Sequence, residues 1–196
     1  MTDSLEREAE AAAPRRPGKR ERLIAAAAQL LHQQGVEKTT LAEIAQSADV
    51  PAGNVYYYFK TKDEIVAAVI EAHLQQVNAM LAAIDRRHRS PRARLKALVG
   101  ELMRQGDLLV RYGCPLGTLC SELDKRADAP AAAELMRIPI GWAEEQFRSL
   151  GRGDAHDLAV SLIAAYEGSA LLTNTLHDPK MLVREARRLD HWIDTL

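Results

Sequence analysis

Hydrophobic residues recur every three or four positions along most of this chain, which is the spacing of one face of an α-helix. The first such stretch starts at about residue 19 and ends at Gly35. Further helices are predicted at about 91–112, 115–127, 130–150, 154–177 and 179–195. Because no stretch shows a sustained alternation typical of strands, the pattern predicts an all-α fold.

Two short helices and one long helix are predicted between residues 40 and 87. Thr40 and Glu43 stand in capping-box register at the start of the first. Pro51 interrupts that helix and can occupy the first turn of the next. Thr61 and Glu64 form a second capping pair, which begins the long helix. Two short helices joined by a tight turn, following the first helix, predict a helix-turn-helix.

The second short helix carries an unusual aromatic run, "NVYYYF", at residues 54–59. On a helical wheel, Val55 and Phe59 share the face that packs inward. Tyr57 lies nearly opposite, beside Gly53 and Asn54, whereas the two neighbouring tyrosines flank the buried face. The outward patch therefore combines a small residue, an amide and a flat phenol.

That outward patch has the chemistry of a major-groove reader. Glycine permits close backbone approach, an amide can bond a base edge, and a phenol can reach a thymine methyl or a phosphate. Lys62 lies at the start of the long helix, where its charge can meet a phosphate. Packing between helices is the alternative interpretation, and we favour it for Tyr58 but not for Tyr57.

Positive charge is concentrated in the part of the chain that carries this surface. The formal net charge of the 196 residues is -1, but residues 15–62 hold eight Lys/Arg and four Asp/Glu. Residues 1–18 are polar, without an apolar period, and are interpreted as a disordered basic tail. Two cysteines, no secretory leader and no membrane-length apolar run favour a soluble, cytoplasmic protein.

The stretch "TTLAEIAQSADVPAGNVYYYFKTKDEI", with "LIAAAAQLLHQQG" before it, resembles the DNA-binding domain of the TetR family of bacterial transcriptional regulators. The resemblance covers about residues 19–70. Asp49 departs from the usual turn glycine, and Pro51 departs from a common serine. The resemblance implies a DNA-binding domain at 19–65 and a helical ligand-binding and dimerisation domain at 66–196. The expected DNA contacts are Thr40, Gly53, Asn54, Tyr56, Tyr57 and Lys62.

The second domain is expected to enclose a small molecule. Pro139 and Gly141 disturb a helix that also carries large apolar residues, which favours a cavity there. The alternative is that each of these residues is ordinary core. The expected ligand-binding residues are Met103, Cys120, Met136, Trp142 and Tyr166.

The last two helices are expected to form a homodimer through a four-helix interface. Their apolar stripes include small residues that permit close approach. An intrachain core is the alternative. The expected interface residues are Leu158, Leu162, Ser169, Leu189 and Trp192.

No catalytic or metal-binding pattern is present in the sequence. The six histidines lack a helical two-histidine motif, and no nucleophile elbow, phosphate loop or paired-carboxylate site is visible. We therefore expect that the protein is not an enzyme and that it binds no metal ion or cofactor. The sequence predicts a ligand-responsive repressor that binds a pseudo-palindromic DNA operator as a homodimer and is released by a small apolar or amphipathic molecule. The alternatives are a thiol-based redox sensor using Cys114 and Cys120, a helical adaptor, or a small enzyme.

Overall fold

A computed structural model describes residues 17–104, 106–124 and 129–196 of the chain. All regular secondary structure within these ranges is helical, so the all-α prediction is confirmed. Residues 1–16, which make up most of the predicted basic tail, lie outside the described residues. The helices are α1 (Lys19–Lys38), α2 (Leu41–Ser47), α3 (Ala52–Tyr58), α4 (Lys62–Arg87), α5 (Pro91–Met103), α6 (Gly106–Tyr112), α7 (Pro115–Leu123), α8 (Ala129–Ser149), α9 (Ala155–Leu176) and α10 (Lys180–Thr195).

The predicted caps begin their helices. The Thr40 hydroxyl accepts from the Glu43 amide at 3.2 Å, and the Glu43 carboxylate accepts from the Thr40 amide at 2.8 Å. The Thr61 hydroxyl accepts from the Glu64 amide at 3.2 Å. These bonds satisfy amide groups that have no partner inside their own helix, so each helix start is fixed by its own sequence.

One helix prediction needs correction, and one helix end agrees with the prediction. The single helix predicted at 91–112 is two helices, because α5 ends at Met103 and α6 starts at Gly106. Glycines at 100 and 106 weaken helix propensity on both sides of this break. Gly35 interrupts the first helix as predicted, because its φ of 84° and ψ of 167° are non-helical, and a short helical stretch up to Lys38 follows this kink.

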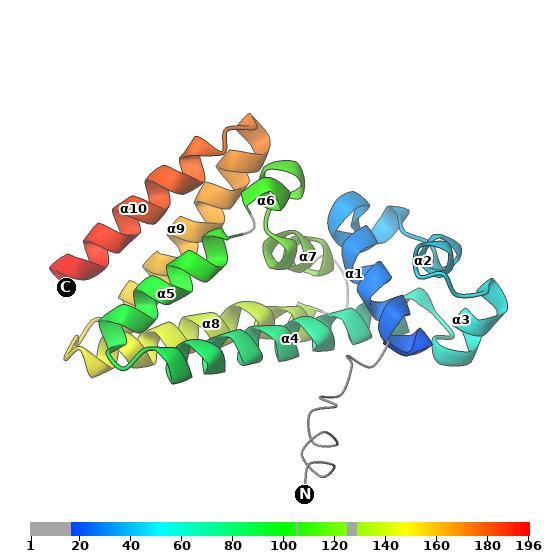
Figure 1. The fold of residues 1–196 in the computed structure, drawn as a ribbon, viewed down its shortest axis with the longest axis horizontal. Helices are drawn as coiled ribbons and strands as arrows, with labels where there is room; N and C mark the ends of the chain where they lie inside the picture. The colour runs from blue at the N-terminus through cyan, green and yellow to red at the C-terminus, as the bar shows by residue number, and fades with distance from the viewer. Residues whose placement is uncertain (1–16, 105, 125–128) are drawn as a thin grey trace, which may run out of the picture.

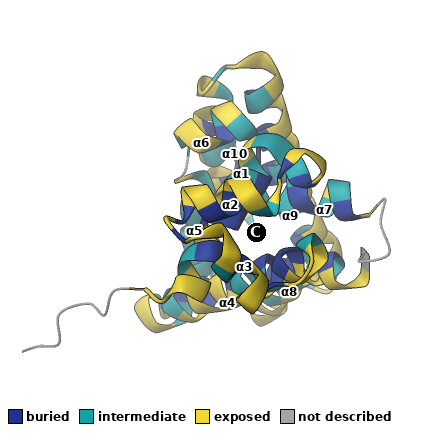
Figure 2. Ribbon diagram, turned by 90° about the vertical axis from the view of Figure 1, so that its right-hand side faces the viewer, coloured by how far each residue is buried: buried dark blue, intermediate teal, exposed yellow. Residues whose placement is uncertain are grey.

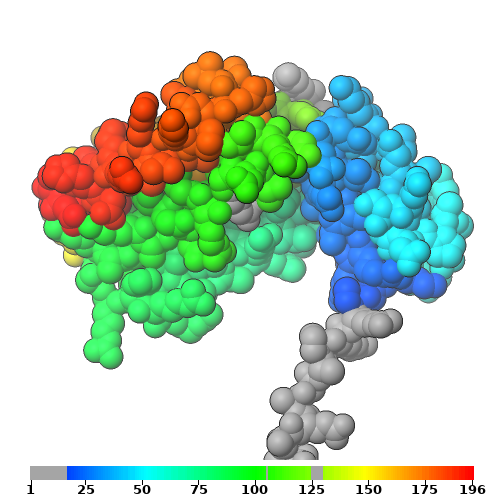
Figure 3. Space-filling model, turned by 45° about the horizontal axis from the view of Figure 1, so that its top comes forward, coloured from blue at the N-terminus to red at the C-terminus, as the bar shows by residue number. Residues whose placement is uncertain are grey.

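The molecule has the DNA-reading candidate α3 at one end and the C-terminus at the opposite end (Figures 1 and 3). The long helices α4 and α8 run side by side along its base and connect the two ends. One buried cluster joins α1–α4 to α7 and α8, and a second joins α4 and α5 to α8, α9 and α10. Both domains therefore share α4 and α8, so they are not separated by a flexible linker.

By length and composition alone, α4 is apolar enough to cross a membrane. Its apolar side chains instead pack within the protein: Ile65 and Val69 lie in the first cluster, and Leu81 and Ile84 lie in the second. The helix thus connects two cores.

Candidate nucleic-acid interface and ligand cavity

Helix α3 presents its aromatic residues as the helical wheel predicts. Val55 and Phe59 are buried, whereas Tyr57 exposes 78% of its surface and Tyr56 exposes 56%. Tyr58 is partly buried and packs against the first cluster. Figure 2, viewed from this end of the molecule, shows α3 as a largely exposed helix. A side chain as large as Tyr57 is free to contact another macromolecule.

Two arginines of α1 contact the residues that flank α3. Asp49, in the turn before it, adopts φ 51°, a conformation that aspartate tolerates better than most residues. Asp49 also lies 3.6 Å from the Arg22 guanidinium of α1. Beyond the helix, the Arg20 guanidinium lies 5.4 Å from the centre of the Phe59 ring. The departure from a turn glycine at position 49 therefore does not disturb the helix-turn-helix.

Of the other predicted DNA contacts, Gly53 and Asn54 lie on α3 itself, whereas Thr40 caps α2 and Lys62 begins α4. Gly53 and Thr40 are exposed, and Asn54 is partly exposed. The Lys62 ammonium donates to the carbonyls of Val36 and Glu37 at 2.9 and 3.1 Å, so it closes the end of α1. An ammonium has three N–H groups, so the two carbonyls do not use all of its donors.

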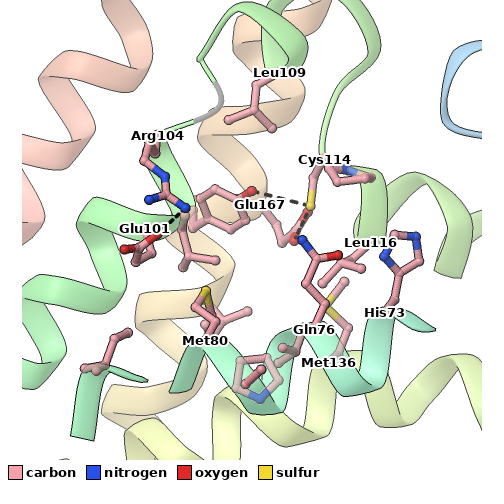
Figure 4. Close-up of a pocket in the computed structure, with 18 of the residues that line it drawn as sticks. His73, Gln76, Met80, Glu101, Arg104, Leu109, Cys114, Leu116, Met136 and Glu167 are labelled. Atoms are coloured by element: carbon pink, nitrogen blue, oxygen red, sulfur yellow. Dashed lines mark hydrogen bonds and ion pairs between the residues drawn. The ribbon is translucent and has the colours of Figure 1, made fainter. Parts of the chain in front are cut away.

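A cavity of about 590 Å³ lies in the second domain, enclosed by side chains from α1, α4, α5, α6, α7, α8 and α9 (Figure 4). Met80 and Ile84 of α4, Leu102 of α5 and Leu109 of α6 provide apolar wall. The volume and the mixture of apolar wall with a few polar groups are those of a small-molecule site.

Two of the five predicted ligand residues, Met136 and Tyr166, line this cavity, as does the helix-interrupting Pro139. The structure places the other three elsewhere. The Cys120 thiol donates to the Ala132 carbonyl at 3.2 Å, and the Trp142 indole N–H donates to Asp85 at 3.1 Å. Met103 packs against the buried clusters. Intrahelical periodicity could not show on which side of a packed helix the empty space lies.

Sequence reasoning missed a partly buried acidic residue of the cavity wall, Glu167 of α9. Its Oε1 accepts from the Cys114 thiol at 3.2 Å, and burial raises the pKa of the Glu167 carboxyl. The Tyr166 hydroxyl also donates to the Cys114 sulfur, at 3.5 Å. One signal was available, because Glu167 is the only charged residue between positions 158 and 176.

The structure gives no support to a thiol sensor. Burial, and the nearby Glu167 charge, raise the pKa of Cys114 to about 12 and the pKa of Cys120 to about 11. The thiolate is the reactive form of cysteine, so both sulfurs are poor nucleophiles at neutral pH. Both cysteines are free.

The predicted dimer residues pack wholly or partly within the protomer. Leu162, Ser169 and Leu189 are buried in the single chain, and Trp192 packs on Phe147 with ring centres 5.8 Å apart. Leu158 is partly buried against the second cluster. The stripe recognised in the sequence is therefore the intrachain face. The opposite, exposed face of α9 carries a second row at helical spacing, made up of Val160, Ala164, Gly168, Leu171, Leu172 and Leu176.

Helix α7 connects the cavity wall to the first domain. At its start, Cys114, Pro115 and Leu116 line the cavity. Near its end, the Glu122 carboxylate accepts from the Val36 amide of α1 at 2.6 Å. This approach requires glycine at position 35, because a Cβ there would lie 2.6 Å from a Glu122 oxygen. Helix α7 is therefore bonded to α1 near its end and forms cavity wall at its start.

Comparison with known proteins gives the family. The sequence profile "Bacterial regulatory proteins, tetR family" matches residues 23–69. The HTH-type transcriptional regulator BetI of Paraburkholderia phymatum is 38% identical over 187 residues, covering 91% of this chain and 92% of that protein. An HTH-type transcriptional regulator of Lactococcus lactis is 28% identical and covers 83% of this chain and 87% of that protein.

Solved structures show the same fold. A TetR transcriptional regulator from Legionella pneumophila superposes with a TM-score of 0.81 at 21% identity, covering 91% of this chain and 97% of that one. Regulatory protein TetR from Rhodobacter sphaeroides gives a TM-score of 0.73 at 26% identity, covering 87% and 96%. Together with the exposed α3 and the full-length similarity to curated regulators, these matches show that the chain belongs to the TetR family of DNA-binding transcriptional regulators, which are not enzymes.

Proposed function

We propose that this regulator is a cytoplasmic repressor that binds a pseudo-palindromic operator as a homodimer and leaves it when a small apolar or amphipathic molecule fills the cavity. The observation that carries the proposal is the position of the cavity, because α4 and α7 line it and also pack against the DNA-binding helices. Repression is the usual mode of the family and gives the sign of the regulation.

Helix α3 reads the operator in this proposal. Exposed Gly53, partly exposed Asn54 and exposed Tyr57 form one surface that fits a major groove. Tyr56, Thr40 and Lys62 contact the flanking phosphates in this proposal, and these contacts fix the register without reading bases. Each protomer occupies one major groove, so the two half-sites lie about 34–36 Å apart, one turn of the duplex.

The exposed row of α9 supports the dimer. Leu171 and Leu172 are exposed, and Gly168 in the same row permits close approach of a second helix. Val183 of α10 extends the apolar surface beside it. In a two-fold symmetric pair, α9 and α10 of both protomers form a four-helix interface, which buries this surface.

The ligand response follows from differential binding. A molecule releases the operator only if it binds more tightly to the form of the protein that cannot hold both half-sites. Filling the cavity displaces α7 relative to α9, and the Glu122–Val36 bond transmits the displacement to α1. The long helix α4, which starts at Lys62 and runs along the cavity, moves in the same step and changes the separation of the two α3 helices.

Binding to the DNA upstream of the protein's own gene tests this proposal. A gel shift and footprint are expected to show protection of two half-sites by a dimer, with a stronger preference for this DNA than for random DNA. Addition of a compound that raises the melting temperature is expected to release the DNA. Protection of one short half-site by a monomer, or no preference over random DNA, would contradict the proposal.

A further inference from the structure

The charged groups on the cavity wall are unevenly distributed. Glu101 pairs with Arg104 at 2.7 Å, so this carboxylate already has a cation. Arg104 and Arg87 are both exposed, which places their charges at the cavity mouth. Burial, and to a lesser extent the nearby His32, lowers the pKa of His73, so this imidazole is uncharged at neutral pH. None of these groups supplies a cation to the inner wall.

Glu167 is the acidic group on that inner wall. Among the described residues its hydrogen-bond partner is the Cys114 thiol, a weak donor, and no basic side chain of these residues forms an ion pair with it. Helix α7 presses closely on the carboxylate, since a Cβ at Gly117 would overlap the Glu167 oxygens. Figure 4 shows Glu167 beside Cys114 at the cavity. The carboxylate is therefore held in place without a countercharge from the part of the chain that the structure describes.

A carboxylate in such surroundings favours one class of ligand. Removing an ionised carboxylate from water is unfavourable unless a cation or strong hydrogen-bond donors compensate for the lost hydration. Burial accordingly raises the pKa of Glu167 in the empty cavity. An anionic ligand would add repulsion, and a purely apolar ligand would remove the remaining water without replacing its hydrogen bonds. A cation restores the missing partner.

We propose that the effector is an amphipathic cation, a protonated amine with an apolar tail, whose ammonium pairs with Glu167 and whose tail lies along Met80, Leu102 and Leu109. The apolar side chains and the Glu167 carboxylate line the same cavity. This inference rests on the proposed function, because it names the chemistry of the effector that the cavity accepts.

Binding of the ammonium to Glu167 also explains how the ligand's effect would be transmitted to the DNA-binding domain. The Cys114 sulfur accepts from the Gly117 amide at 3.4 Å and so caps the start of α7. An ammonium bound to Glu167 competes with the Cys114 thiol for the same oxygen. The start of α7 then loses its bond to α9, while its other end still holds α1 through Glu122.

Three probes with the same eight-carbon tail test the charge requirement. Octylamine, octanol and octanoate are titrated against the full-length protein, with binding measured by calorimetry and by the shift in melting temperature. We expect octylamine to bind about tenfold or more tightly than octanol, which corresponds to one charged hydrogen-bonded pair, and octanoate to bind most weakly. In Glu167→Gln, the preference of octylamine over octanol is expected to disappear.

Glu101→Gln is the matched control, because Glu101 lies on the same wall but already has Arg104 as its partner. This variant is expected to keep the preference for octylamine. Octanol binding to Glu167→Gln shows that the altered cavity still folds. Octylamine binding no tighter than octanol, including no binding at all, contradicts the inference, as does a preference that survives Glu167→Gln. Operator binding without ligand is measured separately, and its absence would contradict the proposed function instead.

Discussion

Tyr57 exposes most of its ring on a helix whose opposite face is buried, so its contribution to folding is small. Its ring meets the Tyr58 ring edge-on at 5.0 Å between centres, which orients the phenol without burying it. The wheel predicted this geometry because neighbouring residues on a helix point about 100° apart, as the helical repeat requires. The three tyrosines therefore have different surroundings although they are adjacent in sequence.

Replacement of Tyr57 tests the DNA-reading surface. We expect Tyr57→Ala to weaken operator binding by ~1–3 kcal/mol, with a smaller loss on random DNA, because a base-reading contact is removed. Thermal stability is expected to change by less than ~0.5 kcal/mol, as for exposed positions generally. Fluorescence anisotropy with operator and random duplexes measures both affinities. An equal loss of affinity for the two duplexes would show that Tyr57 does not read the operator sequence.

The pH dependence of stability tests the surroundings of Glu167. Burial raises the pKa of this carboxyl above its ordinary value of 4.5, so the folded protein keeps a proton that the unfolded chain releases. The stabilisation is present below that ordinary value and is lost as the pH rises through the raised pKa. Glutamine does not titrate. Urea unfolding is therefore expected to show Glu167→Gln gaining stability relative to wild type as the pH rises. A stability difference between Glu167→Gln and wild type that does not change with pH would contradict the raised pKa of Glu167.

At the scale of single helices, α7 is short but touches both functional regions. Its first turn forms cavity wall, and its last turn bonds α1 beside Gly35. This link could not be predicted from the sequence, because Glu122 and Val36 lie 86 positions apart and neither belongs to a local motif. Caps such as Thr40 were predictable because both partners of the bond lie within one turn.

Glu122→Gln tests transmission through α7. We expect this variant to bind the operator without ligand but to lose part of its response to a cavity ligand, because a neutral amide holds the Val36 N–H more weakly. Allosteric coupling is typically about 1–3 kcal/mol, and a loss of about half would be measurable. Operator titrations with and without ligand give the coupling. Ser121→Ala, an exposed change on the same helix, is the control. Unaltered coupling in Glu122→Gln would exclude this route.

At the scale of the whole molecule, the fold and the helix-turn-helix were predictable, whereas the cavity wall and the exposed apolar row of α9 were not. The helix-turn-helix depends on caps and periodicity that are local in sequence. The sides of α9 are both apolar, so periodicity alone identified the buried side, which includes Leu162, as an interface. Only packing against α8 and α10 distinguishes it from the exposed side.

Leu172→Arg tests the exposed side as the dimer interface. Leu172 exposes 47% of its surface, and a charge there would be buried without a partner in the proposed interface. Sedimentation is expected to show monomers at concentrations where the wild type is dimeric. Leu108→Arg is the matched control, since Leu108 exposes 45% of its surface on α6, away from this row. Dimers of Leu172→Arg as stable as those of the wild type would rule out this interface.

The measurement that tests the account most directly is the operator affinity of the full-length protein with and without a compound that raises its melting temperature, in the wild type and in Met136→Trp. Met136 lies on the cavity wall, so the larger indole occupies part of the space that the ligand needs. We predict that the compound releases the operator from the wild type, and that Met136→Trp still binds the operator but no longer responds. If every stabilising compound left operator affinity unchanged, or if Met136→Trp responded as the wild type does, the cavity would not control DNA binding.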